Sequence, residues 1–156
     1  MNIIKFTLSV GVCFLVAIVG SIVTTPAIST WYTTLNKPVF NPPNSLFAPV
    51  WTVLFLLMGI SLYLVWAKKA KAEKKKLAVE LFFAQLIFNY LWSLLFFGLY
   101  SPILAFVDII LLWIAILVTI IKFYDLSKTA AYLLIPYLVW VSFAAILNYS
   151  IIILNR

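Results

Sequence analysis

Five apolar stretches, each about as long as a membrane is thick, constrain this chain more than any other feature. They cover approximately residues 3–25, 45–66, 77–97, 103–121 and 129–154. A helix needs roughly 20 predominantly apolar residues to cross the hydrocarbon core of a bilayer. Of the 156 residues, 66% are hydrophobic and 10% are charged, a composition that a soluble domain of this size cannot hide from water. The sequence therefore predicts one all-α integral membrane domain, residues 1–156, built as a bundle of five transmembrane helices.

The first apolar stretch follows Lys5 near the N-terminus, where a secretory signal peptide is the alternative. Its apolar run, residues 6–23, is too long for a typical signal, and residues 24–26 form a poor cleavage site. We interpret the stretch as a retained span that ends near Pro26. Small side chains recur every four residues along it, which favours close helix approach within the chain or between two copies. They belong to Ser9, Cys13, Ala17, Ser21 and Thr25.

Prolines crowd the segment that leads from the first span into the second. They are Pro38, Pro42, Pro43 and Pro49. Proline fixes φ, lacks a donor and biases the preceding residue away from the helix, so residues 31–44 are predicted to form an ordered, non-helical loop. With Asn44 or Ser45 as the N-cap, Pro49 falls in the first turn of the next helix, where its missing N–H costs little. A stiff loop that also carries Trp, Tyr and Phe suggests a lid over a cavity.

Positive charge is concentrated between the second and third spans, in residues 68–76. In that position a lysine run is more often a determinant of membrane topology than a nucleic-acid site. With five spans, one side of the membrane holds Lys5, the six lysines of the run, Lys122 and Lys128, and the other holds Lys37 and Arg156. The positive-inside rule therefore predicts a multi-pass protein of the cell membrane with a cytoplasmic N-terminus and the proline-rich loop outside.

The sequence has no histidine and a single cysteine, Cys13. These counts exclude a disulfide within the chain and leave no ligand set for zinc or for a haem held by histidine. A histidine general base is excluded as well. We expect no metal site and no resident cofactor, and we interpret Cys13 as a small buried hydrophobic residue.

Aromatic and polar side chains recur at helical spacing on single faces of the spans. The second span carries Trp51 and Phe55, the third Gln85, Asn89 and Trp92, and the fifth Trp140, Ala144, Leu147 and Asn148. Polar groups at this depth should face the bundle interior, because an unpaired one in lipid is costly. There they can line a ligand cavity or hydrogen-bond the helices to one another, and the sequence leaves both open. The interfacial aromatic belt explains tryptophans at span edges, whereas those about two turns inside suit stacking on a flat ligand.

Asp108, in the fourth span, has no basic residue at its depth. This predicts a protonated carboxyl or one bound by neutral donors, with a proton relay as an alternative that lacks a second carboxylate. Pro136, inside the fifth span, predicts a kink or a later helix start.

Short motifs follow one another along nearly the whole chain. They are Trp31-Tyr32, Lys37-Pro38, Pro42-Pro43, Val50-Trp51, Met58-Gly59, Gln85-Leu86 with Asn89, Trp92 with Phe96-Phe97-Gly98, Ala105-Phe106-Val107-Asp108, Leu134-Ile135-Pro136-Tyr137-Leu138-Val139-Trp140 and Leu147-Asn148-Tyr149. In this order they resemble bacterial members of the translocator protein family, also called tryptophan-rich sensory proteins.

The resemblance implies a five-helix membrane bundle, usually dimeric, with a pocket below the first loop. In the family this pocket binds porphyrins and, in animal members, cholesterol and hydrophobic drug-like molecules. The ligand-binding candidates are Tyr32, Pro42, Trp51, Phe55, Asn89, Trp92, Asp108, Trp140, Ala144, Leu147 and Asn148. Some bacterial members degrade protoporphyrin in light, which would make Trp51 and Trp140 catalytic. A sterol role is not favoured, because Arg156 lies one residue beyond the gap that the animal cholesterol motif allows after Tyr149.

The function expected is therefore that of a membrane receptor or sensor that binds tetrapyrroles such as protoporphyrin as ligand or substrate. Membrane lipid and a second copy of the chain are the further partners expected. Light-driven oxidative breakdown of protoporphyrin and transport of tetrapyrroles or lipids are the alternatives, and a purely structural scaffold is a third. The chain has no conventional catalytic motif, so its sequence does not decide between binder, enzyme and transporter.

Overall fold

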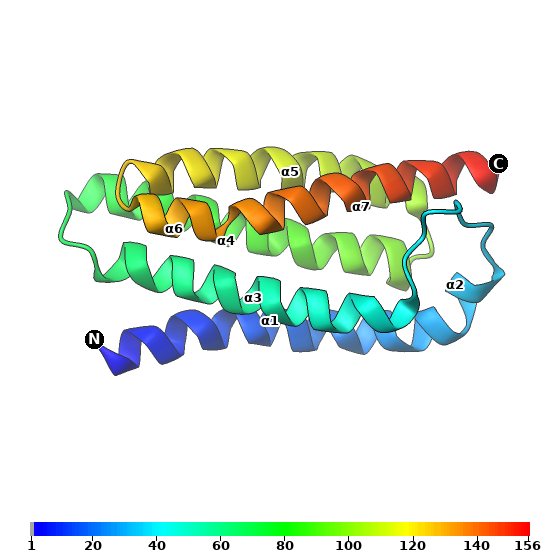
Figure 1. The fold of residues 1–156 in the computed structure, drawn as a ribbon, viewed down its shortest axis with the longest axis horizontal. Helices are drawn as coiled ribbons and strands as arrows, with labels where there is room; N and C mark the ends of the chain where they lie inside the picture. Colours follow the sequence, from blue (N-terminus) through cyan, green and yellow to red (C-terminus); the bar gives the residue numbers. More distant parts are fainter. Residues whose placement is uncertain (1) are drawn as a thin grey trace.

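The computed structural model describes residues 2–156, which form a bundle of long helices and contain no strand (Figure 1). The helices are α1 (Ile3–Ser29), α2 (Trp31–Thr34), α3 (Asn44–Ala67), α4 (Ala72–Ser93) with its π-helical continuation η1 (Leu94–Gly98), α5 (Pro102–Tyr124), α6 (Lys128–Leu133) and α7 (Ile135–Leu154). Five helical segments, with α4 continued by η1 and α6 by α7, are long and apolar enough to cross a membrane. The expected all-α bundle of five spans is confirmed.

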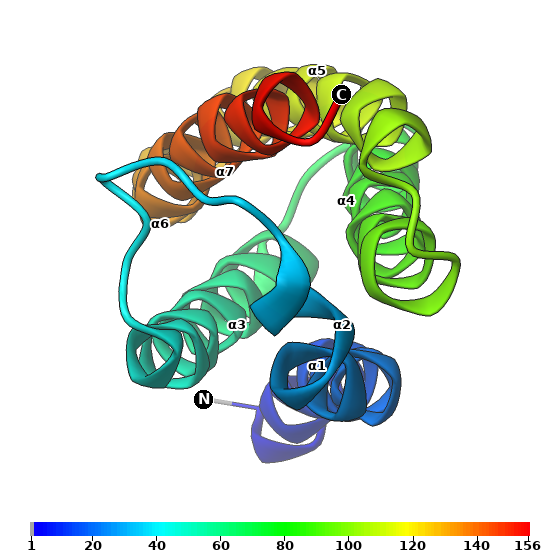
Figure 2. The same ribbon diagram turned by 90° about the vertical axis from the view of Figure 1, so that its right-hand side faces the viewer.

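The spans form a ring when the bundle is viewed from its end (Figure 2). α1 packs on α3, α3 on α6, α7 on α5, α5 on α4, and α4 with η1 returns to α1. The N-terminus, the α3–α4 loop and the α5–α6 turn lie at one end of the bundle, and α2, the proline-rich segment and the C-terminus lie at the other (Figure 1). The lysine run and the proline-rich segment therefore lie at opposite ends, as the sequence predicts.

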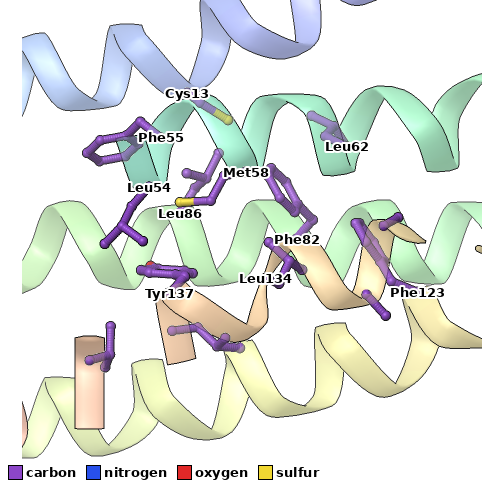
Figure 3. Close-up of a cluster of buried hydrophobic side chains, with 14 of the residues drawn as sticks. Cys13, Leu54, Phe55, Met58, Leu62, Phe82, Leu86, Phe123, Leu134 and Tyr137 are labelled. Atoms are coloured by element: carbon purple, nitrogen blue, oxygen red, sulfur yellow. The ribbon is translucent and has the colours of Figure 1, made fainter. Parts of the chain in front are cut away.

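A buried apolar cluster fills the half of the bundle near the lysine run (Figure 3). Phe82 of α4 stacks on Phe123 of α5 with ring centroids 5.7 Å apart. In the same half, the hydroxyl of Ser61 donates a hydrogen bond of 2.7 Å to the carbonyl of Ala130 and ties α3 to α6. A Cβ on Gly59 would lie 2.7 Å from the Cα of Val10, so α1 and α3 need a glycine here to approach this closely.

Pro26 does not end the first helix, contrary to the sequence-based expectation, because α1 continues to Ser29. A proline costs one backbone hydrogen bond, and in lipid the remaining backbone groups still favour the helix. The carbonyl of Pro26 also accepts hydrogen bonds from the hydroxyls of Ser29 and Thr30, at 3.1 and 2.8 Å. Proline is tolerated here as it is in other membrane helices.

The segment predicted to be a non-helical loop, residues 31–44, is partly helical, because α2 forms one short turn at its start. Hydrogen bonds from the hydroxyl of Thr34 to the carbonyl of Trp31 stabilise such a turn, and no proline interrupts it before Pro38. The expected N-cap is also wrong, since Pro43 occupies that position. Pro49 consequently lies inside α3, beyond its first turn.

Two other boundaries bear on the predictions. The third span begins at Ala72 rather than at residue 77, because the second half of the lysine run is already helical. Pro136 has the predicted effect, since the fifth span is broken at Leu134 into α6 and α7 and Pro136 lies in the first turn of α7. Proline is favoured in that position because the first turn needs no N–H donor.

Candidate functional site: a cavity beneath the proline-rich segment

A cavity of about 380 Å³ occupies the half of the bundle nearest the proline-rich segment. Its walls come from α1, α2, α3, α4, η1 and α7, while α5 contributes none of the lining. The volume lies within the range of about 300–1,000 Å³ that is typical of small-molecule pockets. Most of the lining is apolar, with a few polar side chains among aromatic rings. Such a composition suits a ligand that is largely hydrophobic.

The structure brings most of the predicted ligand-binding residues to this one cavity. Those that line it are Tyr32, Trp51, Phe55, Asn89, Trp92, Trp140, Ala144, Leu147 and Asn148. Pro42 and Asp108 do not line it. Pro42 belongs to the extended chain that approaches α3, and Asp108 is buried on α5, which contributes no lining residue.

Trp51 forms one aromatic wall together with its neighbours on α3 and α7. Its ring lies 5.6 Å from that of Phe55 and 6.2 Å from that of Tyr137, the latter in an edge-to-face arrangement. Tyr137 is buried, and its hydroxyl oxygen accepts a hydrogen bond of 2.8 Å from the side-chain nitrogen of Asn89. This contact joins α4 to α7 and sets the orientation of Asn89, which lines the cavity.

Trp140 forms a second wall, one turn further along α7 than Tyr137. Its ring lies 6.1 Å from that of Phe47 and 5.5 Å from that of Phe143. The ring of Phe143 in turn lies 6.3 Å from that of Phe40 in the proline-rich segment. The indole of Trp140 thus packs against two phenylalanine rings and also lines the cavity.

A third group of rings closes the cavity towards η1. Trp92 stacks on Phe96 with centroids 5.2 Å apart, and Phe96 contacts Phe97 at 4.8 Å. Tyr32, from α2, adds its ring at 6.2 Å from Phe96 and 5.8 Å from Phe97. The π-helical turn carries both phenylalanines, so this irregular segment places two consecutive aromatic rings in the interior.

Asn148 fixes the indole of Trp92. Its side-chain oxygen accepts from the indole nitrogen of Trp92 at 3.1 Å, and its side-chain nitrogen donates to the carbonyl of Pro102 at 2.8 Å. Among the described residues, the indole nitrogens of Trp51 and Trp140 have no such partner, which leaves two donors for a bound molecule.

The family assignment rests on comparison with known proteins. The model of the TspO/MBR family matches residues 9–154 of the chain. The chain belongs to the TspO/MBR family.

Relatives of this TspO/MBR protein come from distant organisms. The tryptophan-rich protein TspO of Chlorobaculum tepidum is 47% identical over 154 residues, which are 99% of this chain and 98% of that protein. The protein of the same name from Archaeoglobus fulgidus is 45% identical over 155 residues, 99% of both chains. The translocator protein of Homo sapiens is 38% identical over 122 residues, which are 78% of this chain and 72% of that protein. The family is thus that of membrane sensor and translocator proteins.

The proline-rich segment of this TspO/MBR protein is fastened across the cavity by side chains. The hydroxyl of Tyr32 donates to the side-chain oxygen of Asn41 at 2.8 Å. Lys37 places its ammonium group 4.8 Å from the centre of the Tyr32 ring and donates to the carbonyl of Leu35 at 3.1 Å. Burial raises the pKa of the Tyr32 phenol from the ordinary value of 10.0 to about 12.

A second fastening joins the segment to the end of α7. The backbone nitrogen of Asn36 donates to the side-chain oxygen of Asn155, and the side-chain nitrogen of Asn155 donates to the carbonyl of Asn36, each at 2.9 Å. The side-chain nitrogen of Asn36 also donates to the backbone carbonyl of Leu154 at 3.3 Å. We call this reciprocal pair the asparagine clasp.

Sequence reasoning missed the contribution of the first helix to the site. The cavity is lined by α1 residues that the sequence suggested only as small side chains for helix packing, among them Ala17, Ser21 and Thr25. Ser9 and Cys13, earlier in the same stripe, are buried against the bundle as that suggestion requires. Small side chains at regular spacing signal a close contact or an open space equally well, so the stripe alone could not distinguish the two.

Proposed function

We propose that this TspO/MBR protein is a receptor or sensor that binds porphyrins, of the protoporphyrin type, in the cavity beneath the proline-rich segment. The observation that carries the proposal is the placing of Trp51 and Trp140 on two different helices around one cavity. Indole rings stack well on flat aromatic ligands, and two of them hold such a ligand from more than one direction.

The chemistry of the lining supports a flat apolar ligand with a few polar groups. Asn89 and Asn148 are the amides that line it, and each already makes a hydrogen bond that sets its orientation. Pre-set polar groups in an apolar cavity give specificity without a large cost of ordering. Hydrophobic drug-like molecules satisfy the same requirements.

A metal-free porphyrin suits the residues better than a haem. The chain has no histidine, and its single cysteine, Cys13, is buried and does not line the cavity. Neither histidine nor cysteine, two of the usual axial ligands of haem iron, is therefore supplied at this site. Recognition would rest on stacking and hydrogen bonding.

Light-driven oxidative breakdown of the bound porphyrin is the second candidate function. It is favoured by one observation, the edge-to-face contact of Trp51 with Tyr137 at 6.2 Å, because tryptophan and tyrosine are the aromatic side chains that most readily lose one electron. In this case Trp51 and Trp140 would act as catalytic residues towards the excited porphyrin, with dioxygen as the final oxidant.

We propose further that the protein lies in the cell membrane with its N-terminus in the cytoplasm and the proline-rich segment outside. The distribution of lysines supports this orientation, because Lys5, the lysine run and Lys128 gather at one end of the bundle. A homodimer within the membrane is the assembly proposed, in line with the exposed apolar surface of the spans, which packs against lipid or a second copy.

Titration of the purified protein with protoporphyrin, followed by illumination, tests both functions. Saturable quenching of tryptophan fluorescence that is weakened in the Trp51→Phe and Trp140→Phe variants supports the binding function. A new product spectrum after illumination, lost when either indole is replaced, supports the enzymatic function. Absence of saturable quenching would contradict both and would leave a structural role for the tryptophans.

A further inference from the structure

We propose that ligands enter the cavity sideways from the membrane, through a slot between the outer halves of α1 and α3, while the proline-rich segment serves as a fixed roof. The slot would admit flat, largely apolar molecules that are already dissolved in the bilayer. This inference rests on the proposed function, because it assigns the route by which that ligand reaches the cavity.

The two helices are in close contact in the half of the bundle near the N-terminus. There a Cβ on Gly59 would meet the backbone of Val10, and the ring of Phe6 lies 5.4 Å from that of Tyr63. In antiparallel helices, residues at the same level have numbers that add up to a constant. The two contacts share the same total, so they define the antiparallel register of α1 and α3. The register can be extended along both helices towards the roof, because each helix continues without a break.

Extending that register brings together residues that all line the cavity. Ala17 lies level with Thr52, Ser21 with Ala48, and Thr25 with Asn44. All of these except Ala17 are also among the exposed residues of the bundle. Exposed side chains that line the cavity from two facing helices are expected where the cavity opens between those helices. The outer halves of α1 and α3 therefore border the mouth of the cavity.

The chemistry of this mouth suits lipid. The hydroxyl of Ser21 donates to the carbonyl of Ile18 at 2.7 Å, and the hydroxyl of Thr52 donates to the carbonyl of Ala48 at 2.8 Å. At Ser21 and Thr52, hydroxyls that bond back to their own helix leave no unpaired donor facing the bilayer, which would cost several kcal/mol in hydrocarbon. Small side chains on both sides also leave room for a flat molecule to pass.

The roof is held in place by hydrogen bonds, which makes entry through it less favourable than entry through the slot. The asparagine clasp joins the segment to α7, and the bond from Tyr32 to Asn41 joins α2 to the chain that precedes α3. The prolines of the segment restrict its backbone further. An opening between the roof and the bundle would have to break several hydrogen bonds, whereas among the described residues no hydrogen bond joins the outer halves of α1 and α3.

A plug of the slot tests the route in vesicles that contain the full-length protein. The variant Ser21→Phe with Ala48→Phe fills the mouth from both sides. The matched control, Ile22→Phe with Leu56→Phe, adds the same rings to the same helices at exposed positions that do not line the cavity. We expect the plug to lower the association and dissociation rates of protoporphyrin at least about tenfold, a barrier increase of about 1.4 kcal/mol, and the control to leave both rates unchanged.

A second readout does not depend on porphyrin binding. Ala144→Cys places a thiol in the cavity wall, and Cys13→Ala removes the native one. A pyrene maleimide dissolved in the vesicle membrane should label this thiol, and the plug should slow the labelling at least about tenfold relative to the matched control. If wild-type protein fails to bind protoporphyrin, the proposed function fails, and the labelling rate still decides the route.

The roof is tested by Asn155→Ala, which breaks the asparagine clasp. Unchanged labelling and association rates in this variant are expected if ligands use the slot. Faster rates after loss of the clasp, or unchanged rates in the plugged variant, would overturn the proposal and assign entry to the roof.

Discussion

The indole nitrogen of Trp92 lies 3.1 Å from the side-chain oxygen of Asn148, and both residues line the cavity. The amide thus holds two helices together and shapes a ligand site with the same group. The sequence left open whether Asn148 packs helices together or lines a cavity, and the structure shows that it does both. In a small membrane bundle each interior polar group can serve both needs.

Replacing Asn148 by alanine should therefore affect both stability and binding. The variant loses the acceptor for Trp92 and the donor to the carbonyl of Pro102, a cost of about 1–3 kcal/mol for the buried groups left without partners. We expect a lower thermal midpoint in detergent and weaker protoporphyrin binding. Ser150→Ala is the control, since its hydroxyl bonds only to its own helix. A binding loss without any change in the midpoint would argue against the structural part of this role.

Gly59→Ala should separate α1 from α3. The added Cβ would come within 2.7 Å of backbone in α1, and backbone cannot move aside as a flexible side chain can. We expect destabilisation of about 1–3 kcal/mol, measured as unfolding in detergent. Gly11→Ala is the matched control, because a Cβ there has no neighbour within 4 Å. Equal stability of the two variants would show that the helices are not in contact at Gly59.

Trp51→Phe and Trp140→Phe distinguish stacking from redox chemistry. Each change keeps a ring but loses stacking area, so the affinity for protoporphyrin should fall by about 1 kcal/mol, roughly fivefold. A light-dependent reaction that draws an electron from the indole should nearly vanish, because phenylalanine is far harder to oxidise. Trp66→Phe, at the opposite end of α3, should change neither. If binding and reaction fall together by the same factor, the indoles only pack against the ligand.

Thiol labelling in intact cells checks the orientation. Val39→Cys, fully exposed in the proline-rich segment, should react with an impermeant maleimide. Lys74→Cys, in the lysine run, should react only after the cells are opened. Cys13 is buried and should remain silent in both tests. The reverse pattern would place the lysine run outside and refute the charge-based orientation.

Tyr32 should make the attachment of the roof sensitive to alkali. Its pKa is raised by burial from 10.0 to about 12, so the folded state retains the proton more strongly than the unfolded state does. The stability that this difference contributes is complete below pH 10 and is lost as the pH rises to about 12. Between pH 10 and about 12, the stability measured by unfolding in detergent should therefore fall more steeply with pH than it does for the Tyr32→Phe variant. Parallel curves for the two proteins would show that Tyr32 is not buried.

The sequence predicted the membrane spans because the bilayer imposes their length and composition, and it predicted the aromatic cavity walls because helical spacing places Trp51 with Phe55 and Trp140 with Ala144. It could not place α1 at the cavity, because the distance between α1 and α3 along their length depends on tertiary packing around Gly59. Nor could it separate Asp108 from the site. Depth along a helix can be read from sequence, whereas the direction in which a buried carboxyl points relative to a cavity cannot.

α5 completes the ring between α7 and α4 but contributes no side chain to the lining of the cavity. Its outward side is a continuous run of exposed apolar residues, including Ile103, Val107, Ile110, Leu111 and Ile114. Recognition and embedding in lipid are thus assigned to different helices. The exposed residues of α5 can therefore be substituted, to match a thicker membrane or to carry a reporter group, without a change in the side chains that line the cavity.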